Sequence, residues 1–159
     1  MSGTNWTIGI DFGTSNTAAA HTNPVKGTVE AVNLSHNRTT MSSSVYVESP
    51  EQIDVGDVAM DKAESNPAGF IPAPKRVIPQ QMFQVNGYDL SASMPVAAVL
   101  SSVVQRVSRE HGNVQPSELV LTHPEAWSSN EIKVLLDAAA QLGLSAAKIS
   151  TISEPQAAA

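Results

Sequence analysis

The chain has 159 residues, a formal net charge of −6 and no cysteine. This length is enough for one domain with its own core, and the lack of cysteine excludes disulfides, thiolate metal sites and thiol nucleophiles. Lys75-Arg76 is the only adjacent basic pair, so nucleic acid is not an expected partner. We find no signal peptide and no apolar run of about 18 residues, and therefore expect a cytoplasmic protein without a membrane partner.

The first third of the sequence predicts an antiparallel meander. Apolar and β-branched residues at 7–11, 17–21 and 29–34 predict three strands, separated by turn segments rich in Gly, Asn and Pro. From 37 to 90 the pattern is irregular. There we expect a strand at 44–48, a short helix at 57–64, and turns at Asn66-Pro67 and Asn86-Gly87.

The second half predicts two helices and two strands. A stripe at helical spacing predicts a helix over 94–111 that ends at Gly112; it consists of Val96, Val99, Leu100, Val103, Val104 and Val107. A buried strand is expected at 119–122. The next helix opens with Ser128 and Glu131 in capping-box spacing and ends near Gly143. Its expected apolar stripe is Ile132, Leu135, Leu136, Ala139 and Leu142.

A last strand is predicted at 148–152, joined to 119–122 by a right-handed crossover. The elements together predict an α/β protein with a mixed sheet covered by helices. Ser153-Glu154-Pro155 resembles the start of a helix that stops within its first turn at Ala159. A single helical turn is unstable alone, so we expect a partial chain.

The segment 8–17 can carry chemistry because a strand delivers Asp11 to its end and Gly13 then turns the chain sharply. A hairpin tip of this kind can wrap phosphates: the N–H groups of Gly13, Thr14 and Ser15 can face anionic oxygens, and Asp11 can hold hydrated Mg²⁺. The segment is not a Walker loop, since no Gly-Lys-Ser/Thr follows. The alternative interpretation is a polar β-turn.

Other polar groups predict no site. Asp54, Asp57, Asp61 and Glu64 have the spacing of a solvated helix face, which we prefer to a metal site. The four histidines lack the spacing of zinc ligands.

A family resemblance extends over nearly the whole chain. The segment 8–20 closely resembles the phosphate-1 motif of the actin, hexokinase and heat shock 70 ATPase superfamily; it reads IGIDFGTSNTAAA. Further matches follow in the order of the heat shock 70 (DnaK-type) chaperones: NRTTMS at 37–42, VGDVA at 55–59, Asn66-Pro67, KRVI at 75–78, VLTHPEAW at 120–127, LGL at 142–144 and ISEPQAAA at 152–159. Several weak motifs in one fixed order are more specific than any one alone, so the chain resembles a divergent, truncated member of this family.

The resemblance implies lobe I of an actin-like ATPase domain, with a ribonuclease H-like fold. We expect a mixed five-stranded sheet with helices in a core subdomain at about 1–38 and 113–159. A smaller peripheral α/β subdomain is expected at about 39–112. The second lobe of the domain would be absent.

The resemblance also assigns roles to single residues. Asp11 would lie near the Mg²⁺ shell and bind the ion through water, and the phosphate hairpin would consist of Gly13, Thr14, Ser15 and Asn16. Lys75 matches the catalytic lysine that stabilises charge at the γ-phosphate. Glu154 matches the glutamate that orders water, and Pro124 matches the proline of an interdomain relay.

Each of the last three residues has a plainer interpretation. Lys75 can be an ordinary surface lysine, Glu154 a helix-start residue that interacts with the helix dipole, and Pro124 a strand terminator.

Several positions depart from the family pattern. Ile132 stands where the family has an arginine that acts with the relay proline, and His123 and Glu125 replace smaller residues. Met41 replaces a proline, Pro74 precedes the lysine and Gln156 replaces a threonine. These departures leave open whether the parent protein hydrolyses ATP and whether a peptide-binding domain follows.

The resemblance implies a chaperone ATPase that binds ATP and Mg²⁺ and couples hydrolysis to protein folding. Its expected partners are the missing second lobe, unfolded client proteins and co-chaperones, and the isolated chain is expected to be inactive. A sugar-type small-molecule kinase of the same superfamily and a non-catalytic actin-like nucleotide switch remain alternatives. Lys75-Arg76 and the ending EPQAAA favour the chaperone.

Overall fold

The computed structural model describes residues 5–23, 26–34, 38–123, 126–144 and 147–153. The main sheet has the order β11 (Lys148–Ser153), β10 (Glu118–His123), β1 (Thr7–Phe12), β2 (Asn16–Asn23) and β3 (Thr28–Ala31). β1, β10 and β11 are parallel, whereas β1–β2 and β2–β3 are antiparallel hairpins. A short strand, β4 (Thr40–Ser42), pairs with the start of β2. The predicted meander and the predicted parallel pair are both confirmed.

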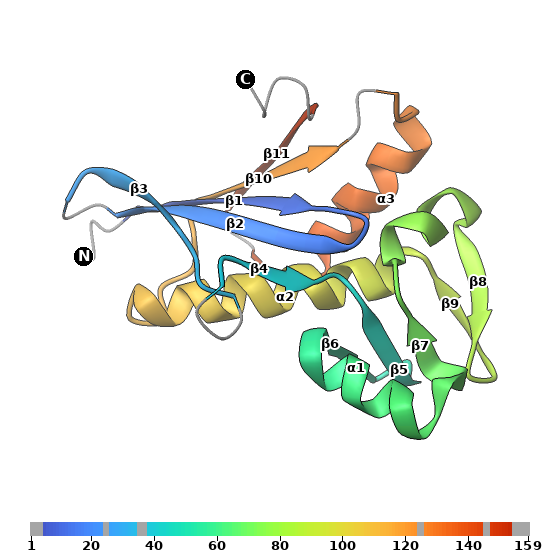
Figure 1. The fold of residues 1–159 in the computed structure, drawn as a ribbon. Coiled ribbons are helices and arrows are strands. Elements are labelled where there is room, and N and C mark those ends of the chain that lie inside the picture. Colours follow the sequence, from blue (N-terminus) through green and yellow to red (C-terminus); the bar gives the residue numbers. More distant parts are fainter. Residues whose placement is uncertain (1–4, 24–25, 35–37, 124–125, 145–146, 154–159) are drawn as a thin grey trace.

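One face of this sheet is buried because apolar residues alternate along its strands. Ile8, Ile10 and Phe12 of β1 are at most 1% exposed, while Gly9 and Asp11 point to the opposite face. The long helix α2 (Ser93–Glu110) lies along the buried face, with α3 (Ser129–Ala140) beside it (Figure 1). The alternation therefore leaves Asp11 on the face that these two helices do not cover.

Both long helices form where the sequence predicts them. All six residues of the α2 stripe are buried, and α2 ends before Gly112, whose φ is +67°. The α3 capping box is present, with Ser128 accepting from the Glu131 N–H. The predicted α3 stripe is partly wrong, because Leu136 is 37% exposed and Ala138 is buried instead. The buried face of α3 is thus narrower and centred on Leu135, Ala138 and Ala139.

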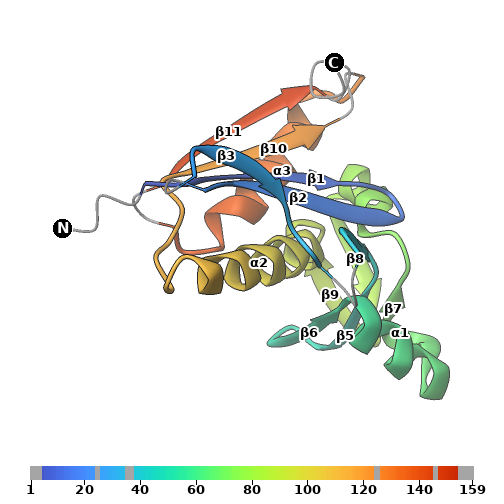
Figure 2. The same ribbon diagram turned by 60° about the vertical axis from the view of Figure 1, so that its left-hand side comes forward.

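The middle of the chain forms smaller sheets at one end of α2 (Figure 2). β5 (Val45–Ser49) pairs with β6 (Gln52–Val55) and β7 (Phe70–Ile71), next to α1 (Gly56–Ser65). Two 3₁₀ segments follow α1, namely η1 (Pro67–Gly69) and η2 (Pro74–Gln80). β8 (Met82–Val85) and β9 (Tyr88–Ser91) form a hairpin whose turn, Asn86-Gly87, has φ values of 50° and 82°, as the dipeptide predicts.

The mixed α/β architecture expected from the sequence is confirmed. The central path has the five expected strands, to which β4 adds a sixth. Among the described residues, no helix is long and apolar enough to cross a membrane.

Candidate functional site

The candidate site lies at the edge where the parallel strands β1 and β10 end. Asp11 is close to the end of β1, and its Oδ1 accepts a hydrogen bond of 2.9 Å from Thr122 Oγ1 near the end of β10. Ser153, at the end of β11, pairs with His123 in the parallel register. The carboxyl ends of three strands therefore meet at one edge, the edge at which open α/β sheets place ligands.

Two of the expected site residues lie outside the described residues. Pro124 directly follows β10, and Glu154 directly follows β11. Their sequence positions alone connect them with this edge.

The β1–β2 hairpin forms the tip beside Asp11. The Gly13 N–H donates to the Asn16 carbonyl over 3.0 Å, which closes the turn. A Cβ on Gly13 would lie 2.4 Å from that carbonyl oxygen, so only glycine fits here. Because the Gly13 N–H is used inside the turn, the N–H groups left for an anion are those of Thr14 and Ser15. Neither has an acceptor among the described residues.

The segment after β4 supports the hairpin from one side. Ser43 is fully buried, and its backbone N–H donates to the Ser15 carbonyl over 2.9 Å. Its hydroxyl donates to the Gly13 carbonyl over 2.9 Å and lies 2.8 Å from the Thr17 hydroxyl. Sequence reasoning missed Ser43, because a serine in a Ser-rich segment has no motif of its own.

Lys75 is the second residue of the 3₁₀ segment η2. Pro74 is buried at the start of this 3₁₀ segment, where its fixed φ suits a first helical residue. The Lys75 ammonium is 5.6 Å from the centroid of the Trp127 ring. Trp127 in turn stacks near His123, with 6.2 Å between ring centroids. Through Trp127, Lys75 contacts the segment that follows β10, the strand that ends beside Asp11.

The figures agree with this placement. In both views the green η2 segment lies next to the tip of the β1–β2 hairpin (Figures 1 and 2). Three separate parts of the sequence, namely the hairpin, η2 and the residues after β10, thus gather at one end of the sheet.

A cavity of about 300 Å³ lies beside the hairpin tip, between Ser15 and Asn16 and the residues of β4 and α1. Its lining combines hydroxyl and amide groups with a guanidinium, a carboxylate and two thioethers: Ser15, Asn16, Arg38, Thr40, Met41, Ser42, Asp57 and Met60. Met41, which departs from the family's proline, belongs to β4 and pairs with Thr17 of β2.

Of the acidic residues around α1, Asp54 forms an ion pair with Lys62, which also contacts Glu48. The Lys62 ammonium lies 2.6 Å from Asp54 and 3.1 Å from Glu48. Hydrogen bonds with Asp54 and, to a smaller extent, with Glu48 raise the pKa of Lys62. Across the described ranges, no group of three or more histidine or acidic residues could hold a metal ion.

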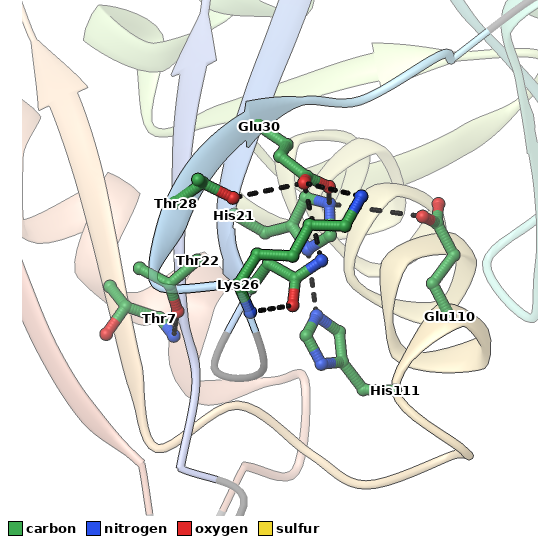
Figure 3. A network of polar contacts seen from close by, with 9 residues as sticks. Thr7, His21, Thr22, Lys26, Thr28, Glu30, Glu110 and His111 are labelled. Carbon is green, nitrogen blue, oxygen red and sulfur yellow. Dashed lines mark hydrogen bonds and ion pairs between the residues drawn. The ribbon is translucent and has the colours of Figure 1, made fainter.

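A second polar cluster lies at the opposite end of α2 (Figure 3). The buried His21 of β2 makes a hydrogen bond of 2.8 Å through Nδ1 to His111 Nε2, just after α2. His21 Nε2 faces the carboxylates of Glu30 and Glu110, each at 3.9 Å. The His111 ring stacks on Trp6 with a centroid distance of 3.9 Å. Burial and, to a smaller extent, the charge of His21 lower the pKa of His111.

The comparison with curated proteins supplies the family. Chaperone protein DnaK of Elusimicrobium minutum is 32% identical over 156 residues, which is 96% of this chain and 25% of that protein. Chaperone protein DnaK of Picrophilus torridus is 30% identical over 154 residues, 95% of this chain and 25% of its own length. The same protein of Endomicrobium trichonymphae matches at 30% over 154 residues.

The chain is a divergent heat shock 70 relative. It spans about a quarter of the length of the curated DnaK proteins that it matches. No protein-family model matches the chain. The mixed α/β fold described above is compatible with an actin-like ATPase lobe, as expected for a DnaK relative.

Proposed function

We propose that this chain is lobe I of a heat shock 70-like chaperone ATPase and forms one wall of an ATP and Mg²⁺ site. The observation that carries the proposal is the hairpin tip, where the N–H groups of Thr14 and Ser15 lie close in sequence to a carboxylate at the same strand edge. Backbone donors at a tight turn are a recurrent way to bind phosphate oxygens.

The residues at the hairpin tip suit both a phosphate group and Mg²⁺. Gly13 has no side chain to hold a phosphate away from the backbone, and the hydroxyls of Thr14 and Ser15 are further donors. Asp11 offers hard oxygen, the ligand type that hydrated Mg²⁺ prefers. Thr122 fixes this carboxylate through Oδ1. Bound Mg²⁺ would neutralise negative charge on the phosphate oxygens.

Lys75 is the residue of this chain proposed to act in hydrolysis. Its ammonium lies over the Trp127 face, which attracts a cation. An ammonium held in this way can stabilise negative charge that develops on a transferred phosphoryl group. Glu154 is proposed to order water and Pro124 to relay the nucleotide state, on the strength of the family match alone.

We also propose a core subdomain and a peripheral subdomain. The expected bounds (core 1–38 and 113–159, periphery 39–112) put β4 and α2 in the periphery, but β4 pairs with β2 and α2 covers the main sheet, so we propose that both belong to the core. A second lobe would close the cleft. The same proposal includes ATP hydrolysis by the whole protein and a cytoplasmic location. It also includes client proteins and co-chaperones as partners. All of these rest on the similarity to DnaK proteins.

Binding of ATP and Mg²⁺ to residues 1–159 tests the core of this proposal. One wall provides few contacts against the entropy cost of binding, so we expect a dissociation constant on the order of 1 mM. The shifts of the Thr14 and Ser15 amide signals in NMR spectra should report it. Asp11→Asn should weaken the Mg²⁺-dependent part, whereas Asp61→Asn on the exposed face of α1 should not.

Two results would count against the proposal. Unchanged hairpin signals at saturating nucleotide would remove the phosphate site. Micromolar affinity, measured by calorimetry, would contradict the idea that a second lobe supplies most of the contacts.

A further inference from the structure

Ser43 contacts the phosphate hairpin through both its side chain and its backbone. The hydroxyl donates to the Gly13 carbonyl, and the N–H donates to the Ser15 carbonyl. Ser43 is 0% exposed and immediately follows β4, which pairs with β2 at the base of the hairpin. The two carbonyls on either side of Thr14 are therefore held by one buried residue.

The direction of the hydroxyl bonds follows from proton counting. A serine hydroxyl carries one hydrogen, and Ser43 gives it to a carbonyl, which can only accept. In the 2.8 Å contact between the two hydroxyls, Thr17 must then be the donor. The result is a directed chain from Thr17 through Ser43 to Gly13. All buried side-chain polar atoms of the described residues have a partner, these two included.

The geometry of the Gly13–Thr14 peptide links these hydrogen bonds to the orientation of the Thr14 N–H. The Gly13 carbonyl and the Thr14 N–H belong to one planar trans peptide and point in opposite directions. A hydroxyl that fixes the Gly13 carbonyl toward the buried Ser43 therefore fixes the Thr14 N–H in the direction away from Ser43. This is the orientation that a phosphate oxygen requires.

We propose that Ser43 is a positioning residue that orients the Thr14 N–H for phosphate binding. The proposal rests on the proposed nucleotide site and deepens it. Ser43 does not touch the ligand, but it prevents the Gly13–Thr14 peptide from rotating, so that the donor is in place before the phosphate arrives.

The positioning role of Ser43, which we call the Ser43 clamp, is tested first without any ligand. In residues 1–159 we expect an NMR order parameter of about 0.85 for the Thr14 N–H, falling below about 0.6 in Ser43→Ala. Exchange of the Gly13 amide hydrogen, which bonds to Asn16, should become about tenfold faster. The matched control is Ser44→Ala. Ser44 is 2% exposed, and its hydroxyl bonds to Ser42 and not to the hairpin.

The functional half of the test measures binding and uses Mg²⁺-tripolyphosphate as the probe. We expect Ser43→Ala to weaken its binding about tenfold, as judged from the Thr14 and Ser15 amide shifts, because about 1.4 kcal/mol corresponds to that factor. Ser44→Ala should bind like the unaltered chain. Should Ser43→Ala not fold, Thr17→Val removes the donor at the head of the hydroxyl chain in an isosteric way and should weaken binding about threefold.

The possible outcomes distinguish failure of the Ser43 clamp from failure of the proposed nucleotide site. An unchanged Thr14 order parameter in Ser43→Ala would overturn the clamp, whatever the probe does. If the unaltered chain gives no shifts with tripolyphosphate, the proposed nucleotide site fails and the functional half fails with it, while the order parameter still decides whether Ser43 orders the tip. Equal losses of affinity in Ser43→Ala and Ser44→Ala would reduce Ser43 to a structural role.

Discussion

Thr122 donates a hydrogen bond of 2.9 Å to Asp11 across 111 residues of sequence, and thereby joins the ends of two parallel strands. The bond holds the carboxylate at the strand edge through one oxygen. We expect Thr122→Val to raise the dissociation constant for Mg²⁺-nucleotide about fivefold, since a hydrogen bond of this kind contributes about 1 kcal/mol. Titrations at several Mg²⁺ concentrations measure the effect.

Ser150→Ala is the control for that experiment. Ser150 pairs with Val120 on the neighbouring strand and, like Thr122, is partly exposed. If both variants lose the same affinity, the Thr122 bond has no specific role.

Gly13 and Gly9 form a matched pair on one strand and its turn. Gly13→Ala would place a Cβ 2.4 Å from the Asn16 carbonyl, whereas a Cβ at Gly9 would meet no atom within 4 Å. Gly13→Ala should therefore lower the free energy of unfolding by about 2 kcal/mol through overpacking. Gly9→Ala should raise it by about 0.5 kcal/mol, because alanine loses less backbone entropy in a strand. Urea denaturation of both variants checks the difference, and equal stabilities would contradict the tight turn.

Lys75 is expected to act in the chemical step and not in binding. In the intact protein, Lys75→Ala should abolish ATP hydrolysis and leave nucleotide binding measurable, because the ammonium stabilises charge that develops during transfer. Single-turnover rates and equilibrium binding separate these effects. Trp127→Leu, which removes the ring under the ammonium, should lower the hydrolysis rate by a smaller factor of about five. A single-turnover rate unaffected by Lys75→Ala removes this residue from the mechanism.

The histidine pair at the far end of α2 predicts how stability depends on pH. The pKa of His111 is lowered in the folded chain, mainly by burial and then by His21, while Glu110 acts in the opposite direction. The unfolded chain therefore binds the proton more strongly. This contribution to stability is complete above the ordinary pKa of 6.5 and is lost as the pH falls through the lower folded pKa.

Thermal melts at a series of pH values test this dependence. The other charged groups around the pair are Glu30 and Glu110, with Lys26 4.0 Å from Glu30. His111→Gln keeps a hydrogen-bonding side chain beside His21 but cannot titrate, so its melting temperature should fall less steeply below about pH 6.5. An identical slope in both chains would show that His111 does not cause the loss.

The long periodic elements could be predicted from the sequence, and the short strands of the middle could not. The α2 stripe repeats from Val96 to Val107 within a helix of 18 residues, and the Ser128 capping box has a fixed spacing, so both signals outweigh local noise. β4 and β7 have three and two residues, too few for a period. Their positions depend on tertiary pairing with β2 and β5.

The same distinction holds for the candidate site. Asp11 and Gly13 could be predicted because one compact motif contains both. Ser43, Thr122 and Trp127 were not predicted as parts of the site, because they reach it only through the fold. The partners that hold a functional group are set by three-dimensional contacts and leave no trace in the spacing of the sequence.

The long separation between Asp11 and Thr122 implies an order of assembly during folding. The turn bond between Gly13 and Asn16 is local and needs only the residues of the β1–β2 hairpin. The anchor of Asp11 needs β10, whose Thr122 lies 111 residues further along the chain. Closing so long a loop is the slower event. The tip therefore exists early as a mobile hairpin and acquires its fixed carboxylate late, when β10 joins β1.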